Sequence, residues 1–438
     1  MNTRDLTFLA LREVLSRNKN SDQVFAEICN KNALYGRDKK FFYAMTKGII
    51  KRKIYLDYII DFIRAEFGFY IENDDLRNVL RLGLYQLIFM DSVPNYAAVS
   101  ETVNLCKSQY SKKSAGKVNA FLQKYLQNKN IELPKGKNAF LSVKYSFPIS
   151  LIRKWLRKYG EEDTIKMCKY FNAPAKLHVR FNPDKISYED FSKHLDSLEV
   201  KYTKSEYFPY LIRMEQNFDF ISDEMFKKGF YYLQDESTVF PPLLLDPQKG
   251  EKILDICAAP GGKAFMMSAI LHDSNQIYVN DVSEEKLEII KENANRLKCN
   301  NLKYFCEDAR EFHSSEKFDK ILADVPCSGL GVMRRKPEIR LRFSADSLLQ
   351  LLDMQQQILE NCAKLIKTGG VIVYSTCTFN GFENENQIEK FLDKHKNFVL
   401  DSPEAFVDKN VVIDKYIKTY PFKHDMDGSF AARLRKVN

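Results

Sequence analysis

The sequence predicts a multidomain protein: an all-helical N-terminal domain, a small mixed α+β module, and a C-terminal α/β domain built on a parallel sheet. Two observations carry this prediction. Apolar residues recur at helical spacing through residues 1–130, without strand-like alternation of comparable strength. From residue 250 onward, short apolar runs alternate with amphipathic segments, which is typical of a parallel sheet with helices on both faces. The 438 residues suffice for two or three domains.

The first domain is predicted to span residues 1–135. Helical spacing is clearest in two stretches, whose apolar members are Leu6, Leu9, Ala10, Val14 and Leu15, and Val79, Leu80, Leu82, Leu84, Tyr85, Leu87 and Ile88. Pro94 interrupts the pattern, and a further helix is expected after it. Residues 127–139 are polar and basic and contain Pro134 and Gly136, so we interpret them as a linker.

Residues 145–230 are predicted to form the small α+β module. A helix should end at Gly160, and another is expected near 187–197. Strand-like runs occupy 176–181 and 207–214.

The third predicted domain covers residues 231–438. The expected strands are those of KILDI, QIYVND, LKYFCED, FDKILADV and GGVIVYSTC, and helix-like segments lie between most of them.

Charge is distributed unevenly along the chain. Residues 1–150 contain 24 Lys and Arg against 14 Asp and Glu, a net of +10, whereas the remaining 288 residues have a net of −1. A positive excess confined to one domain favours contact with nucleic acid. A solvated lysine-rich surface explains the same numbers.

Cysteine usage and hydropathy indicate the compartment. The nine cysteines form no CxxC pair, so neither a zinc ribbon nor a disulfide scaffold is expected. No apolar run approaches the roughly 20 residues of a membrane span, and the amphipathic N-terminus does not resemble a secretory signal. We therefore expect a cytoplasmic protein with reduced thiols and no membrane association.

A glycine-containing turn follows the first strand of the α/β domain. Its sequence, CAAPGGK over 257–263, is neither a G-x-G-x-x-G dinucleotide fingerprint nor a phosphate-binding P-loop. Ligands of open α/β sheets bind outside the carboxyl ends of the strands, where Asp281, Asp308 and Asp324 follow later strands. Each aspartate alone is compatible with a helix cap, but the set favours a nucleoside-bearing cofactor.

Two cysteines end predicted strands, Cys327 after 318–325 and Cys377 after 370–376. Taken alone, Cys377 is best explained as a buried core thiol, since cysteine is among the most buried residue types. Its sequence context changes that interpretation.

Three segments together resemble the RNA cytosine-5 methyltransferases of the RsmB/Nop2/Sun family: 255–263 (DICAAPGGK), 324–329 (DVPCSG) and 375–378 (STCT). Further matches extend from about residue 176 to the C-terminus and are 179–182 (VRFN), 232–238 (YLQDEST), 334–338 (RRKPE), 383–385 (ENE) and 427–430 (DGSF). The N-terminal domain resembles the NusB-like RNA-binding fold through 93–107 and 116–120. The resemblance implies a class I, Rossmann-like, S-adenosylmethionine-dependent methyltransferase.

The resemblance also implies the chemistry. Cytosine C5 is a poor nucleophile until a thiolate adds to C6, which is covalent catalysis. By resemblance, Cys377 is the nucleophile, Cys327 assists product release, and Asp324 bonds the edge of the base. Lys263 either contacts the base or is a solvent-facing lysine at the start of a helix. The expected S-adenosylmethionine contacts are Cys257, Ala258, Ala259, Pro260, Gly261, Gly262, Lys263, Asp281, Asp308 and Asp324.

The implied substrate is 16S ribosomal RNA, at the cytosine conventionally numbered 967, either naked or in an early small-subunit particle. Two alternatives remain: the same chemistry on tRNA or another RNA, and a non-catalytic RNA-binding or transcription-associated protein. We expect a monomer without a metal. Three residues depart from the family pattern, namely Thr238, Lys286 and Ser429, and the last puts local C-terminal packing in doubt.

Overall fold

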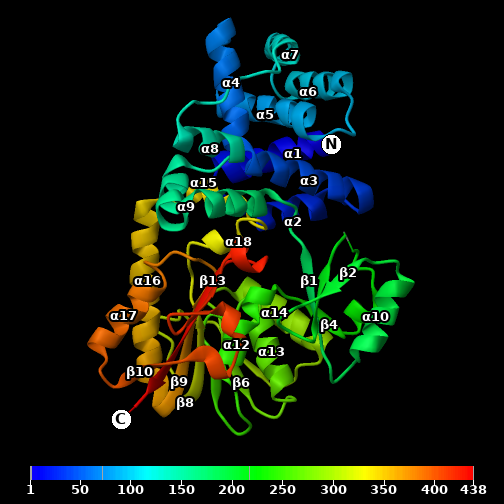
Figure 1. The fold of residues 1–438 in the computed structure, drawn as a ribbon. Helices are drawn as coiled ribbons and strands as arrows, with labels where there is room; N and C mark the ends of the chain where they lie inside the picture. The colour runs from blue at the N-terminus through cyan, green and yellow to red at the C-terminus, as the bar shows by residue number, and fades with distance from the viewer. Residues whose placement is uncertain (1, 72, 217, 438) are drawn as a thin grey trace. The chain divides into compact units, whose positions relative to one another are not determined.

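The computed structural model describes residues 2–71, 73–216 and 218–437. The chain divides into two compact units, one comprising Met1–Ala173 with Arg335–Arg342 and the other Pro174–Arg334 with Phe343–Asn438. Figure 1 shows the helices and strands of each unit. Among the described residues, no helix is both long enough and apolar enough to cross a membrane.

The first unit is helical. Its elements are α1 (Thr3–Leu11), the π-helical η1 (Arg12–Ser16), α2 (Ser21–Lys31), α3 (Gly36–Lys51), α4 (Lys53–Phe67), α5 (Asp74–Phe89), α6 (Asn95–Gln109), α7 (Lys112–Gln127), α8 (Lys137–Tyr145), α9 (Ile149–Asn172) and α15 (Ile339–Arg342). Side-chain caps define several of the starts: Asn2 forms a capping box with Asp5, and Ser111 accepts from the Ser114 amide. Gly160, where the sequence predicted a helix end, has φ 78° and interrupts α9.

A short segment from the C-terminal half of the sequence completes the helical unit. Arg340, in α15, is fully buried and donates to the carbonyls of Lys51, Ser146 and Phe171. Its guanidinium also lies 3.8 Å from the centre of the Phe147 ring. Burial without a carboxylate partner lowers the pKa of Arg340 to about 9. The buried arginine therefore fixes residues 335–342 within the helical unit.

The second unit begins with a small antiparallel sheet in the order β2-β3-β1-β4. Its elements are β1 (Leu177–Phe181), α10 (Tyr188–Ser197), β2 (Tyr202–Lys204), β3 (Leu211–Met214), α11 (Glu224–Lys227) and β4 (Tyr231–Leu233). The β-α-β-β-α-β sequence and this strand order define a ferredoxin-like fold. The predicted strands near 176–181 and 207–214 and the predicted helix near 187–197 are thus present.

A larger sheet follows, in the order β11-β12-β13-β9-β8-β5-β6-β7, with β10 paired to β13. Its strands are β5 (Ile253–Asp255), β6 (Ile277–Asn280), β7 (Leu302–Phe305), β8 (Phe318–Asp324), β9 (Ile366–Thr376), β10 (Phe398–Asp401), β11 (Val412–Ile413), β12 (Tyr416–Thr419) and β13 (Ser429–Lys436). The helices of this part are η2 (Glu236–Thr238), α12 (Phe240–Leu245), α13 (Gly262–Ile270), α14 (Glu284–Leu297), η3 (Leu330–Val332), α16 (Ala345–Leu365), α17 (Glu385–Lys394), η4 (Pro403–Ala405), η5 (Lys409–Val411) and α18 (Pro421–His424).

Alternating strand residues build two apolar layers, one on each face of this sheet. In β8, Leu322 packs with α12, α13 and α14, whereas Ile321 and Ala323 pack with α16 and α17. In β9, Val373 belongs to the first layer and Tyr374 to the second. The period of two along each strand produces this division, and Figure 1 shows the two groups of helices around the sheet.

The sheet is parallel from β7 to β9, as the sequence predicted, but its other edge is antiparallel. Strand β13 runs antiparallel to β9, pairing Ala431 with Ser375 and Arg435 with Val371. No strand was predicted after Cys377. The four parallel neighbours β5, β6, β8 and β9 therefore share one carboxyl edge, where the site residues gather.

Candidate active site

The turn after β5 is shaped by glycine. Gly261 has φ 99°, in the left-handed region, and a Cβ there would lie 2.6 Å from the Phe265 ring. Helix α13 starts at the next residue, Gly262. A side chain at Gly261 would both strain the backbone and separate the turn from the helix. The predicted cofactor turn therefore has a conformation that requires glycine.

Asp281 closes the turn from the side. It lies directly after β6, is 8% exposed, and accepts from the Ala259 amide at 3.2 Å and from the Ser283 amide at 3.1 Å. A carboxylate held by two amides is fixed in position and still has free lone pairs for hydroxyl donors. Asp308 follows β7 and is instead held by the Arg310 guanidinium, whose hydrogen bonds lower the pKa of this carboxyl.

Lys263 and Asp324 form a pair at the carboxyl edge of the sheet. The Lys263 ammonium donates to Oδ2 of Asp324 at 2.6 Å, and the Ser375 hydroxyl donates to Oδ1 at 2.7 Å. Burial works against the ammonium, but the Asp324 carboxylate outweighs it and raises the pKa of Lys263. Lys263 is thus not a solvent-facing lysine. Asp324 is arranged as an acceptor, because each of its oxygens already faces a donor.

The two predicted cysteines lie beside each other. The Sγ atoms of Cys327 and Cys377 are 3.2 Å apart, within hydrogen-bonding distance for sulfur. The hydrogen bond to Cys377, together with burial, raises the pKa of Cys327 well above its usual value. Cys327 therefore keeps its proton and can donate it toward the Cys377 sulfur. Both thiols are half-buried and unoxidised.

Glu383 joins the two cysteine loops, and no role was predicted for it. It is fully buried, and it accepts from the Ser328 amide at 2.7 Å and the Ser328 hydroxyl at 2.6 Å. Asn380 donates to the same carboxylate at 2.9 Å and Gln355 at 3.3 Å. Ser328 directly follows Cys327, while Asn380 and Glu383 follow Cys377. Four donors on one buried carboxylate thus fix the spacing between the two thiols.

A glycine allows the same two loops to approach. The Gly331 amide donates to the Cys377 carbonyl at 3.0 Å, and the Gly428 amide donates to the Gly331 carbonyl at 3.1 Å. A Cβ on Gly331 would overlap the Gly428 carbonyl oxygen and lie 2.7 Å from that of Cys377. The requirement for glycine comes from this close approach and is invisible in the local sequence.

Asp255 is a second buried carboxyl at this edge of the sheet, and the sequence pattern predicted no role for it. It ends β5, is 1% exposed, and neither of its carboxyl oxygens has a hydrogen-bond partner among the described residues. Burial raises its pKa to about 8, although the Lys263 ammonium opposes that rise. This buried carboxyl beside the 256–261 turn therefore has no cation in direct hydrogen-bond contact among the described residues. S-adenosylmethionine, with an ammonium at one end and ribose hydroxyls for Asp281, fits this set of groups.

Some of the predicted site residues contact one another, and others do not. The structure brings Cys327 and Cys377 into contact and pairs Lys263 with Asp324, whereas Asp308 is paired with Arg310. Within residues 2–71, 73–216 and 218–437, no cluster of three His, Cys, Asp or Glu side chains is arranged to hold a metal ion.

The family departure at Ser429 does not disturb local packing. The side chain is buried, and its Oγ lies 2.9 Å from the Thr419 hydroxyl. The doubt about this part of the C-terminus is therefore removed.

Three family models match successive parts of the chain. The NusB family model matches residues 1–127, the ferredoxin-like domain of the RsmF/B-like methyltransferases matches 147–220, and the model described as 16S rRNA methyltransferase RsmB/F matches 242–435. Together with the Rossmann-like sheet, these matches define an S-adenosylmethionine-dependent methyltransferase with an N-terminal NusB domain.

Full-length relatives specify the family. The chain is 34% identical to the probable ribosomal RNA small subunit methyltransferase B of Synechocystis sp., covering 100% of both chains, and 29% identical to that of Bacillus subtilis, covering 99% and 98%. The chain belongs to the ribosomal RNA small subunit methyltransferase B family. The crystal structure of NSun6 from Pyrococcus horikoshii with the cofactor analogue SFG shares the fold, with a TM-score of 0.61 and 23% identity over 67% of this chain and 99% of that one.

Proposed function

We propose that this protein methylates C5 of one cytosine in 16S ribosomal RNA, with Cys377 as the nucleophile and Cys327 assisting release. The observation that carries the proposal is the pair of thiols 3.2 Å apart beside the Lys263–Asp324 pair. One thiol suffices to activate a pyrimidine, and a second in contact with it suits a reaction that must also break the bond to the first. The ribosomal substrate is inferred from the names of the relatives.

In the first stage, the Cys377 thiolate adds to C6 and electron density moves to C5 and N3. The Lys263 ammonium is the available donor for the charge that develops at the edge of the ring. Asp324 is held as an acceptor and can receive the exocyclic N4 amino group. Bound S-adenosylmethionine supplies the electrophilic methyl group. The target cytosine must leave its stack to reach the thiols.

In the second stage, the proton on C5 and the bond between C6 and Cys377 must both be lost. The C6–S bond breaks as the electrons of the C5–H bond form the C5–C6 double bond. Cys327 donates its proton to the departing Cys377 sulfur and takes up the C5 proton in its place. Its raised pKa favours both parts of this exchange, because the thiol is protonated beforehand and its thiolate is a strong base once the proton has left. The Glu383 contacts keep the two sulfurs at this spacing throughout the cycle.

Radiolabel transfer from S-adenosylmethionine to 16S rRNA tests the proposal, with Cys306→Ala as the matched control because Cys306 is exposed and has no role in the site. Wild type and the control should transfer the label, and Cys377→Ala should not. Cys327→Ala should accumulate a denaturant-resistant protein–RNA band. Undiminished transfer by Cys377→Ala would reject the nucleophile, and absence of the band would reject the division of labour.

Bisulfite sequencing of the product identifies the methylated cytosine. Parallel reactions with naked 16S rRNA, small-subunit particles and tRNA identify the substrate form. Preferential methylation of tRNA would overturn the ribosomal assignment.

A further inference from the structure

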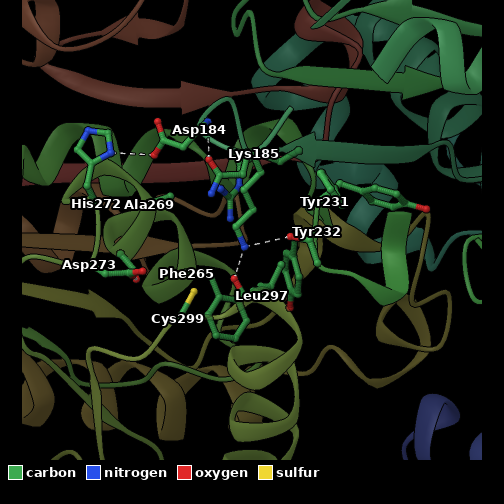
Figure 2. A pocket seen from close by; sticks show the side chains of 15 residues that line it. Asp184, Lys185, Tyr231, Tyr232, Phe265, Ala269, His272, Asp273, Leu297 and Cys299 are labelled. Carbon is green, nitrogen blue, oxygen red and sulfur yellow. Dashed lines mark hydrogen bonds and ion pairs between the residues drawn. The ribbon is translucent and has the colours of Figure 1, made fainter. Parts of the chain in front are cut away.

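A second pocket lies in the C-terminal unit, between the small antiparallel sheet and the far end of α13. It is a cavity of about 50 Å³, and its lining includes Arg180, Lys185, Tyr232, Ser268 and Cys299. Figure 2 shows the Lys185 side chain reaching toward Leu297, with the Asp184–His272 pair on another side of the pocket. None of the residues of the proposed active site lines it.

Arg180 supplies a buried positive charge without an anionic partner. The residue is 6% exposed, and among the described residues its guanidinium donates one hydrogen bond, from Nε to Oε1 of Gln234 at 2.7 Å. Burial lowers the pKa of Arg180, and among the described residues no carboxylate pairs with it. A buried guanidinium is costly unless an anion and further acceptors satisfy it. Its two Nη groups therefore lack the oxyanion that such a site normally provides.

Other cations surround Arg180. The Lys185 ammonium donates to the carbonyls of Gly229 and Leu297, which leaves one of its three N–H groups for a further acceptor. A shallow depression of about 370 Å³ adjoins it, lined by Lys185, Lys228, Phe230 and Lys298. Lys228 and Lys298 are both exposed.

The acidic groups of the pocket are already engaged. Asp184 accepts from His272 at 2.8 Å, and Asp273 accepts from the Ser268 hydroxyl. Burial lowers the pKa of Lys185, and the charge of Asp273 opposes that shift. Neither carboxylate forms a hydrogen bond with Arg180 among the described residues, so the guanidinium has no direct anionic partner in the pocket.

An apolar chamber shares Arg180 with this pocket. Its volume is about 250 Å³, and its apolar lining is Phe181, Pro183, Tyr210, Leu243, Met266, Ala269 and Ile270. An apolar chamber on one side of the guanidinium and lysines on the other favour a ligand with a flat organic body and a phosphate. A phosphodiester within folded RNA does not suit Arg180, because the guanidinium is recessed from the surface.

We propose that this pocket binds a small nucleotide, with the phosphate on Arg180 and Lys185 and the base in the apolar chamber. The inference does not depend on the proposed methylation chemistry. Lys228 and Lys298, at the mouth, would attract the phosphate electrostatically without direct contact.

Calorimetric titration of the full chain with AMP tests the proposal, in saturating S-adenosylhomocysteine so that the cofactor site is closed to the nucleotide. AMP should bind more tightly than either adenosine or inorganic phosphate. Lys185→Gln should weaken AMP binding about tenfold or more, as expected for loss of a direct charged contact. Lys249→Gln is the matched control, since Lys249 is exposed and lines none of these cavities, and should leave binding unchanged.

Two further variants separate binding from folding. Arg180→Gln should abolish AMP binding, and its melting temperature shows whether the fold survives. Ile270→Glu changes a 37% exposed residue of the chamber and should repel the nucleotide without unfolding the protein. Absence of AMP binding at millimolar concentration, binding unaffected by Lys185→Gln, or equal affinity for inorganic phosphate would overturn the proposal. The proposal would also be overturned if these variants weakened the binding of an RNA oligonucleotide without terminal phosphates and left AMP binding unchanged.

Discussion

Glu383 offers a sharp test of how the thiol pair is held. Replacing it with glutamine keeps the shape but removes the charge and turns one acceptor oxygen into an NH₂ group. The new NH₂ group is best tolerated in place of Oε2, because the Ser328 hydroxyl there can rotate and accept a hydrogen bond. The Asn380 amide also donates to Oε2, at 2.9 Å, so in the variant two donors would face each other and this hydrogen bond would be lost. The Ser328 amide and Gln355 keep their acceptor.

The expected cost follows from these contacts. Hydrogen bonds to charged groups contribute about 1.5–3 kcal/mol each, and one is lost while another is weakened, so Glu383→Gln should destabilise the C-terminal unit by about 2–3 kcal/mol. For a unit of this size, that corresponds to a fall in melting temperature of roughly 5–10 °C. If the whole cost falls on the release step, turnover slows by about 30–150-fold.

The assay pairs thermal melting with single- and multiple-turnover methyl transfer. Glu383→Gln should still form the covalent RNA adduct, because Cys377 directly follows β9. Release should be slow, because the weakened contact with the Ser328 hydroxyl loosens the Cys327 loop. Glu360→Gln is the matched control, since Glu360 pairs with Lys394 and His395 near the surface and should cost at most about 1 kcal/mol. Normal release by Glu383→Gln, with a melting temperature within 1–2 °C of wild type (roughly 0.5 kcal/mol), would refute this account.

Three further predictions follow from the same structure. Gly331→Ala should prevent native packing of the two cysteine loops, which would be measured as a loss of cooperative melting. Gly116→Ala is the control: a Cβ at this helical position meets no neighbouring atom, so the substitution should stabilise the protein by about 0.5–1 kcal/mol. Equal effects of the two substitutions would contradict the close approach at Gly331. Asp255 has a folded-state pKa of about 8 against an ordinary 3.8, so its contribution to stability is present at low pH and is lost as pH rises to 8, by up to about 1.4 kcal/mol per pH unit. Asp255→Asn should therefore gain melting temperature over wild type progressively from pH 5 to pH 8 while losing affinity for S-adenosylmethionine by calorimetry, and a pH-independent difference would contradict the assignment. Arg340→Ala should destabilise the helical unit by about 3–5 kcal/mol, because a buried guanidinium that donates to four acceptors is removed. Hydrogen exchange in α9 should therefore become faster, and an unchanged exchange rate would contradict this reasoning.

Much of the architecture could be predicted from local pattern. The apolar period of the helical domain, the helix break at Gly160 and the alternation after residue 250 all depend on neighbouring residues, and the structure has each of them. The antiparallel β13 could not be predicted in this way. Its pairing with β9 joins residues more than fifty positions apart, and such a pairing leaves no periodic signal in either strand.

The sequence by itself determined which chemical groups the candidate site contains: two thiols and a set of aspartates after predicted strands, and a lysine at the start of a predicted helix. Only the tertiary structure decided their relations. It brought the sulfurs to 3.2 Å through the buried Glu383 and paired Lys263 with Asp324. It also left Asp255 without a cation, and Arg180 without an anion, in direct hydrogen-bond contact among the described residues. It buried Arg340 among helices that are distant in the sequence. The physical reason is that strand ends are set by local hydrophobic pattern, whereas distances between loops and the desolvation of a charge depend on everything that packs around them.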